Sequence, residues 1–182
     1  MMDNSKTNKK EFLDSLKTFI IVLAIALIFR LFVFNFTTVK GHSMDDTLKE
    51  KDLLLVDKIG TNFRNYERGD IVILDAPDVA KKLYVKRIVG LPGEKIDLID
   101  GSFYINGEKL EEDYTNAPYT YENEELGISS WILAKDEYFV VGDNRIKNIS
   151  KDSRTFGPIK RDSLEGHAIY RFYPFNNIGS LH

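Results

Sequence analysis

The chain has 182 residues, of which 43% are hydrophobic and 29% are charged, and its formal net charge is −3. This length suits one folded domain plus a short additional segment, and the hydrophobic fraction excludes wholesale disorder. The chain contains no cysteine, so disulfide bonds, thiolate nucleophiles and cysteine-ligated metal sites are excluded. Residues 1–36 carry a net charge of +2 and the remainder carries −5, which argues against a nucleic-acid-binding surface.

A long apolar segment, Thr18–Phe36, dominates the N-terminal part of the chain. Its 19 residues would span about 28 Å as a helix, close to the thickness of the hydrocarbon core of a bilayer. Arg30 interrupts the run near its outer end, where a long side chain can reach toward the headgroups. Four lysines precede the segment. The positive-inside rule therefore predicts a cytoplasmic tail over residues 1–17 and an extracytoplasmic domain over residues 37–182.

Two other interpretations of this apolar segment stay open. A cleaved secretory signal would have a shorter apolar run followed by small residues, whereas this run ends in Phe34-Asn35-Phe36. A buried helix of a soluble domain is disfavoured because the segment has no polar face. An uncleaved, single-pass transmembrane anchor over residues 18–36 is therefore the prediction.

Short strands and turns are expected in the rest of the chain. Val, Ile, Leu, Tyr and Phe concentrate in brief runs separated by Gly, Pro, Asp-Gly and Asn-Gly, a pattern typical of antiparallel sheets. The polar stretch 113–130 is expected to be a surface excursion, either a small lobe or a flexible loop. The predicted fold class is mainly β. The expected strands are Asp52–Ile59, Ile71–Leu74, Leu83–Val89, Lys95–Ile99, Ser102–Ile105, Glu137–Val141 and His167–Phe172.

Ser43 and Lys86 are the two residues most suggestive of chemistry. Ser43 follows the apolar segment, and Lys86 lies in a run, Tyr84–Val89, that is expected to be a buried central strand. A serine needs a neighbouring base to become a nucleophile. A lysine can serve as that base when burial lowers its pKa enough to leave the amine neutral. A salt-bridged or snorkelling lysine without a catalytic role is the alternative.

Four segments together resemble the sequence boxes of type I signal peptidases, in the family's order and behind a single N-terminal apolar segment. The resemblance covers most of residues 15–175, and its size and single anchor are most similar to the short Gram-positive form. The segments are Gly41-His42-Ser43-Met44 with Thr47-Leu48, then Arg68-Gly69-Asp70-Ile71-Val72, then Tyr84-Val85-Lys86-Arg87-Ile88-Val89-Gly90-Leu91-Pro92-Gly93, and finally Gly142-Asp143-Asn144-Arg145 with Asp152-Ser153-Arg154 and Gly157.

The resemblance implies an antiparallel, coiled-sheet β catalytic domain with a small β lobe inserted at about residues 98–136. It implies a membrane-bound serine endopeptidase, with its catalytic domain outside the cell membrane, that removes N-terminal signal peptides from exported preproteins. No cofactor or metal is expected, and the three histidines follow no metal-ligand spacing. The expected partners are preprotein signal peptides, the lipid bilayer and the secretion translocon, and no nucleic acid.

The resemblance also implies roles for individual residues. Ser43 would be the nucleophile and Lys86 the general base, while Ser150 would orient the lysine amine by hydrogen bonding. Arg87 would be structural. The residues expected to support the site are Met44, Asp143, Asp152 and Arg154.

The chain departs from the family pattern at a few positions. Asp46 stands where the family usually has proline, Ile149 replaces an asparagine, and the final box is longer than usual. Gly41 has no hydroxyl that could reach an oxyanion. Asp46 and the longer final box motivate the alternative of a specialised paralogue, for example for surface structures such as pili. A non-catalytic, membrane-tethered assembly factor is a further alternative, which the presence of both Ser43 and Lys86 disfavours. A soluble self-cleaving repressor, which also uses a Ser–Lys dyad, is disfavoured by the apolar segment.

Overall fold

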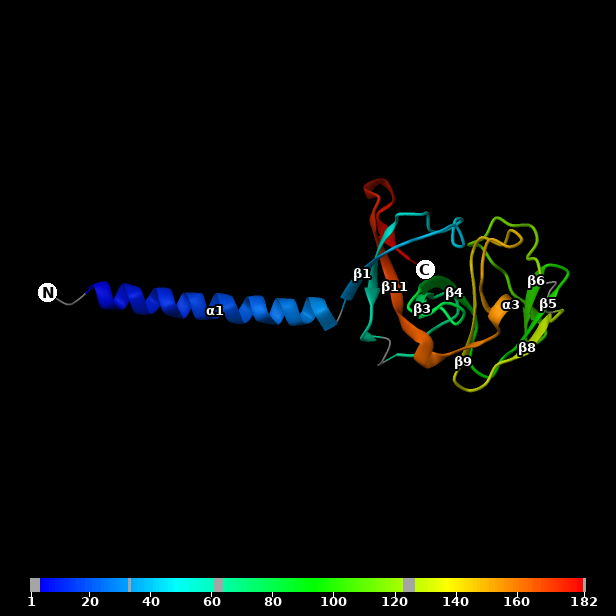
Figure 1. Ribbon diagram of the computed structural model, residues 1–182, viewed down its shortest axis with the longest axis horizontal. Coiled ribbons are helices and arrows are strands. Elements are labelled where there is room, and N and C mark those ends of the chain that lie inside the picture. Colours follow the sequence, from blue (N-terminus) through cyan, green and yellow to red (C-terminus); the bar gives the residue numbers. More distant parts are fainter. Residues whose placement is uncertain (1–3, 33, 61–63, 123–126, 182) are drawn as a thin grey trace.

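The computed structural model describes residues 4–32, 34–60, 64–122 and 127–181 of the chain. A long N-terminal helix leads into a body built mainly of strands (Figure 1). The elements are α1 (Asn4–Phe32), β1 (Phe34–Thr38), β2 (Leu53–Asp57), β3 (Ile71–Asp75), β4 (Leu83–Gly90), β5 (Lys95–Ile99), β6 (Ser102–Ile105), β7 (Glu108–Lys109), β8 (Ser130–Ile132), β9 (Glu137–Val141), α3 (Ser153–Phe156), β10 (Ile159–Lys160), η1 (Arg161–Ser163), β11 (Leu164–Tyr173), η2 (Phe175–Asn177) and β12 (Gly179–Ser180).

The helix α1 extends away from the β body, as Figure 1 shows, and its side chains over residues 11–25 are exposed. The apolar run expected over 18–36 is divided, because α1 ends at Phe32 and β1 pairs with β2 from Phe34 onward. Within the described part of the chain, no helix has both the length and the apolar character needed to cross a bilayer. The transmembrane anchor and the domain limits drawn around it therefore stay predictions.

Two sheets make up the β body. The larger has eight strands in the order β1-β2-β11-β3-β4-β9-β10, with β12 paired to β11. The smaller has four strands in the order β7-β6-β5-β8 and is formed within residues 95–132. All the described strand pairs are antiparallel, so the prediction of a mainly β, antiparallel fold is confirmed.

Each of the seven expected strands corresponds to an observed one. The largest difference is at β11, which begins at Leu164 rather than at His167. The sequence did not indicate β1, because its phenylalanines continue the apolar run of the helix. It also did not indicate β7, β8, β10 and β12, which have two or three residues each and are too short to produce a periodic signal.

The central strand β4 supplies side chains to two separate apolar clusters. Ile88 packs with residues of β3 and β9, whereas Val89 packs with Phe103 of the smaller sheet and with Phe139. Neighbouring side chains on a strand point to opposite faces, so one strand can serve both clusters. Lys86 and Arg87 lie on the same buried stretch, where a charge is costly unless it is paired or neutralised.

Candidate active site

The amine Nζ of Lys86 lies 2.7 Å from the hydroxyl Oγ of Ser43. Ser43 belongs to a tight turn over residues 41–47, which we call the serine turn. Lys86 lies on β4, opposite Val72 of β3, and its amine also donates a hydrogen bond to the carbonyl oxygen of Val85 at 2.9 Å. Two residues that are 43 positions apart in the sequence are thereby brought into direct contact.

Burial changes the acid–base properties of Lys86, whose side chain is only 2% exposed. Removal from water lowers the pKa of Lys86 from 10.5 to about 8. The carboxylates of Asp152 and Asp143 raise the pKa and offset part of this effect, whereas Arg154 and Lys82 lower it further. With a pKa of about 8, about a tenth of the molecules have a neutral amine at pH 7.

Asp152 is fully buried and organises the segment that follows β9. Its carboxylate accepts hydrogen bonds from Ser150 Oγ (2.6 Å) and Gly142 N (3.1 Å), and it lies 2.7 Å from Nη2 of Arg154. Burial would raise the pKa of Asp152, but the Arg154 guanidinium and these donors hold it below its usual range. Ser150 donates its hydroxyl proton to Asp152. The expected hydrogen bond between the Ser150 hydroxyl and the Lys86 amine stays a prediction.

Asp143 connects β4 to the serine turn. Its carboxylate forms an ion pair with Arg87, with 2.8 Å between Nη2 and Oδ2, and both side chains are almost completely buried. Thr47 donates its hydroxyl to the same carboxylate at 2.5 Å. The backbone N–H of Asp143 points to the sulfur of Met44 at 3.4 Å, and the Met44 side chain is buried. These contacts hold the serine turn against the strand that carries Lys86.

Asn144 holds the serine turn at a second place, although the sequence predicts no role for it. Its backbone N–H donates to the carbonyl oxygen of Ser43 at 3.0 Å, and its side-chain amide donates to the carbonyl oxygen of His42 at 2.9 Å. Gly142, two residues before Asn144, also lies close to the main chain of Ser43. A Cβ atom on Gly142 would overlap with the carbonyl oxygen of Ser43. Asn144 is part of the final sequence box, but its role follows only from its partners in space.

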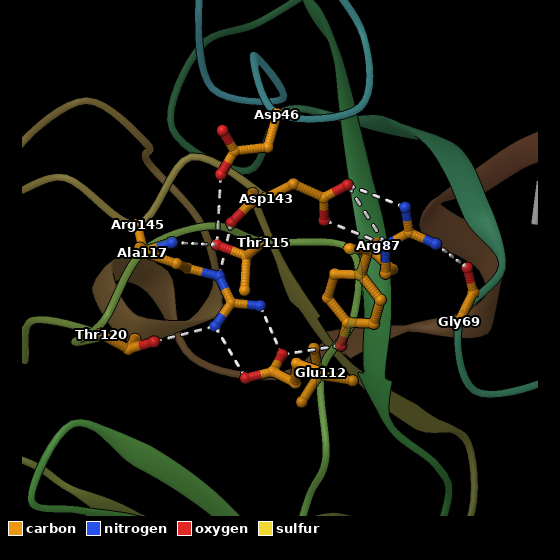
Figure 2. Close-up of polar contacts among 12 residues, drawn as sticks. Asp46, Gly69, Arg87, Glu112, Thr115, Ala117, Thr120, Asp143 and Arg145 are labelled. Atoms are coloured by element: carbon orange, nitrogen blue, oxygen red, sulfur yellow. Dashed lines mark hydrogen bonds and ion pairs between the residues drawn. The ribbon is translucent and has the colours of Figure 1, made fainter.

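The polar segment 110–121, which we call the strap, packs on the far side of the same network. The guanidinium of Arg87 lies 4.1 Å from the ring centroid of Tyr114, and the Tyr114 hydroxyl donates to Glu112 at 2.7 Å. Figure 2 shows Glu112 and Thr120 converging on the guanidinium of Arg145, which is completely buried. The strap is therefore fixed to the body by a cation–π contact and a buried ion pair.

Asp46 forms a further link between the strap and the serine turn. Its carboxylate accepts hydrogen bonds from the backbone N–H of Asn116 at 3.1 Å and from the hydroxyl of Thr115 at 3.3 Å (Figure 2). The position where the family pattern has proline is thus used here to bind the strap. Since Asp46 is exposed, water competes for these hydrogen bonds and the link is weak.

A cleft of about 490 Å³ opens in front of Ser43 and Lys86. Residues 37–44 form one wall and residues 81–86 form the other, with Ile73 and Ile149 adding apolar surface. Both walls contain extended backbone, which can pair with an extended peptide. Within the described residues, no group of His, Asp and Glu is arranged to hold a metal ion.

An antiparallel β body with a serine and a buried lysine in a peptide-sized cleft is the arrangement expected of a peptidase. The signal peptidase, peptidase S26 family matches residues 12–173. The chain belongs to this family, and the resemblance inferred from its sequence boxes is confirmed.

Two named relatives agree with this assignment. A probable signal peptidase I-2 of Synechocystis sp. is 36% identical over 170 residues, which cover 91% of this chain and 75% of the relative. Signal peptidase IB of Staphylococcus aureus is 35% identical over 181 residues, which cover 92% of this chain and 93% of the relative. The crystal structure of a signal peptidase I from Enterococcus faecalis V583 is 35% identical, with a TM-score of 0.47 over 57% of this chain and 97% of that chain.

Proposed function

We propose that the protein is a membrane-bound serine endopeptidase that removes N-terminal signal peptides from exported preproteins. In this proposal Ser43 is the nucleophile and Lys86 is the general base. The observation that carries the proposal is the 2.7 Å contact between Lys86 Nζ and Ser43 Oγ, made by an amine whose pKa burial lowers to about 8. The relatives named signal peptidase supply the substrate class.

The proposed reaction is acyl transfer through a covalent intermediate. The neutral Lys86 amine takes the hydroxyl proton of Ser43 while Oγ attacks the carbonyl carbon of the scissile peptide bond. The backbone N–H of Ser43 is expected to stabilise the developing oxyanion. The protonated amine then gives its proton to the leaving nitrogen, which becomes the N-terminus of the mature protein. Water, activated by the same amine, releases the signal peptide from Ser43.

The remaining site residues act by holding these two groups in place. Asp143 and Met44 support the serine turn, while Asp152 and Arg154 support the segment that carries Ser150. Misplacing reacting groups by about 1 Å can lower a rate about a hundredfold, so this support is part of the proposed mechanism. The oxygen of Ser150 can still accept a hydrogen bond from the Lys86 amine while its proton is held by Asp152.

We also propose that α1 anchors the protein in the membrane, with the β body on the outer side. Exposed apolar side chains follow one another along α1, including Phe19, Ile21 and Val22, and such a surface is unusual in contact with water. Lysines precede these residues, which favours a cytoplasmic N-terminus. Signal peptides, the lipid bilayer and the secretion translocon are the partners that follow from this location.

The test is cleavage of a labelled preprotein in detergent by the parent protein and by Ser43→Ala and Lys86→Ala. We expect the parent to cut after a site with small side chains at the first and third positions before the cut, and both variants to lose this activity. Lys109→Ala, an exposed lysine of the smaller sheet, is the matched control and should keep full activity. Cleavage that survives both active-site substitutions would falsify the dyad.

The range of substrates separates the proposal from its alternatives. Cleavage of several unrelated preproteins indicates a general signal peptidase, whereas cleavage of a narrow set indicates a paralogue dedicated to surface structures such as pili. Binding without cleavage indicates an assembly factor and contradicts the enzymatic proposal.

A further inference from the structure

Four exposed lysines surround the cleft that holds Ser43 and Lys86. They are Lys40, Lys81, Lys82 and Lys151, and we call them the lysine rim. None of the described residues that line the cleft is Asp or Glu. Since residues 37–182 carry a net charge of −5, this local concentration of positive charge runs against the average of the domain.

Among the residues that the structure describes, carboxylates compensate little of the charge of the lysine rim. Lys151 Nζ lies 3.1 Å from Asp78, which also accepts a hydrogen bond from the Tyr84 hydroxyl at 2.9 Å. The Lys82 amine lies 5.1 Å from the ring centroid of Tyr84, a contact that stabilises a cation without neutralising it. The nearby carboxylate of Asp45 lies 3.0 Å from Nδ1 of His42. The rim can therefore attract an anionic group that enters the cleft.

The position of Lys82 defines where along a bound peptide this attraction acts. β4 is extended from Leu83 onward, so Lys82 and Lys86 are about 13 Å apart along the chain, at about 3.3 Å per residue. A peptide strand that pairs with this wall, with its scissile bond at Lys86, places a residue about four positions away beside Lys82.

The strand directions indicate which side of the scissile bond faces the rim. β1 and β4 run in the same direction, because the four pairings that connect them through β2, β11 and β3 are all antiparallel. In this shared direction Thr37 precedes Ser43 and Lys82 precedes Lys86, so we take Thr37 and Lys82 as the end of the cleft nearest α1. If α1 is the membrane anchor, a signal peptide leaving the bilayer enters from that end.

We propose that the lysine rim gives the enzyme a preference for preproteins with an acidic side chain about four residues before the cleavage site. This inference rests on the proposed peptidase function and names a feature of its substrates. A carboxylate among several lysines is attracted by all of them, whereas a lysine of the substrate is repelled. The attraction is screened by salt because the rim is exposed.

The preference for an acidic side chain should not extend to substrate positions beside Lys86. A carboxylate bound directly beside Lys86 would favour the protonated amine and remove the base, as the effects of Asp143 and Asp152 on its pKa illustrate. An acidic residue of the substrate is therefore expected to speed cleavage when it lies beside Lys82 and to slow cleavage when it lies next to the scissile bond.

The test uses three peptide substrates that differ only at the fourth position before the cut, which is Glu, Gln or Lys. Cleavage is measured as kcat/KM in neutral detergent at low salt. We expect the Glu peptide to exceed the Gln peptide by about fivefold and the Lys peptide to fall below both, with the differences shrinking at high salt. Moving Glu to the position beside the cut should lower kcat/KM.

Charge reversal of the rim is the decisive comparison. The double variant Lys81→Glu/Lys82→Glu should prefer the Lys peptide over the Glu peptide, whereas the control Lys109→Glu should keep the parent's order. The double variant Lys81→Gln/Lys82→Gln should cleave the three peptides with smaller differences than the parent, because only Lys40 and Lys151 of the rim remain. Its cleavage of the Gln peptide shows that the fold is retained.

Several outcomes overturn the proposal. Equal cleavage of the Glu and Gln peptides by the parent contradicts it, as does a preference that survives charge reversal. An effect of charge reversal that appears only on vesicles containing anionic lipid, equally for all three peptides, would assign the rim to lipid headgroups instead. A parent protein that cleaves none of the peptides contradicts the proposed peptidase function, and the rim proposal fails with it.

Discussion

Gly142 lies against the main chain of Ser43 so closely that no side chain fits between them. A Cβ atom on Gly142 would overlap both with the carbonyl oxygen of Ser43 and with the hydroxyl oxygen of Ser150. Residue 142 immediately precedes Asp143 and Asn144, which hold the serine turn through hydrogen bonds. The absence of a side chain at this position therefore permits the close approach on which the site geometry depends.

The first prediction concerns this close approach. Gly142→Ala should lower kcat/KM about a hundredfold or more, because the backbone of Ser43 must shift to admit the new methyl group. The measurement is cleavage of a preprotein together with the melting temperature. Gly179→Ala is the control, since a Cβ atom there meets no other atom within 4 Å. Unchanged cleavage by Gly142→Ala would show that the serine turn can relax without loss of function.

The pH dependence of cleavage should report the protonation of Lys86. With a pKa of about 8, protonation removes the base as the pH falls, so kcat/KM should drop about tenfold per pH unit below pH 8. Lys82→Gln should move the midpoint upward, because the charge of Lys82 is one of those that lower the pKa of Lys86. The peptide used must not titrate in this range. Activity that stays constant down to about pH 5 would contradict a lysine base.

Lys86 should also make the stability of the fold depend on pH. Its pKa falls from 10.5 in the unfolded chain to about 8 in the folded protein, so between these values only the unfolded chain binds the proton. Stability should therefore rise as the pH increases from 8 to 10.5, and below pH 8 the cost of burying the charge is fully present.

Lys86→Met tests this cost directly. The substitution keeps an unbranched side chain of similar length but removes the charge, so it should stabilise the folded protein by about 3 kcal/mol at pH 7 while abolishing cleavage. The free energy of unfolding is measured in urea at pH 7 and at pH 10, where the gain should be much smaller. A variant that is less stable than the parent at pH 7 would contradict a desolvated lysine.

The fourth prediction concerns the ion pair that fixes the strap. Glu112→Ala should destabilise the fold by about 3 to 5 kcal/mol, because it leaves the completely buried guanidinium of Arg145 without its carboxylate. Glu111→Ala, at the exposed neighbouring position, should change stability by less than about 0.5 kcal/mol. Thermal unfolding of the two variants makes the comparison. Equal melting temperatures would mean that Arg145 finds another partner or reaches water.

The strands were predictable from the sequence because their residues carry a local signal. β3, β4 and β9 are runs of Val, Ile, Leu and Phe, and the turns between strands contain glycine. β1 reads Phe-Asn-Phe-Thr-Thr, and its two phenylalanines follow closely on the apolar residues at the end of α1. Hydrophobicity alone could not show where the helix ends and the strand begins.

The site was predictable only to the extent that the residues have recognisable chemistry. Ser43 was identified because it lies in a recognisable sequence box just after the apolar segment. Lys86 was identified because a lysine within an apolar strand is unusual. The roles of Asn144, Tyr114 and Glu112 depend on partners that are distant in the sequence, and a polar loop of Tyr, Asn and Glu has no pattern that reveals them. The strap, expected as a surface excursion, therefore emerged only from the contacts in three dimensions.

The contacts of the strap also decide how this chain could be shortened. In the sequence, the smaller sheet and the strap look like an insertion between two parts of a catalytic core, a piece that could be cut out and replaced by a tight turn. Removing them would take away the carboxylate that pairs with Arg145 and the aromatic ring that covers Arg87. Two buried guanidinium groups would then lose these partners at the cut surface. A minimal version of this protein must therefore redesign both arginines together with the deletion.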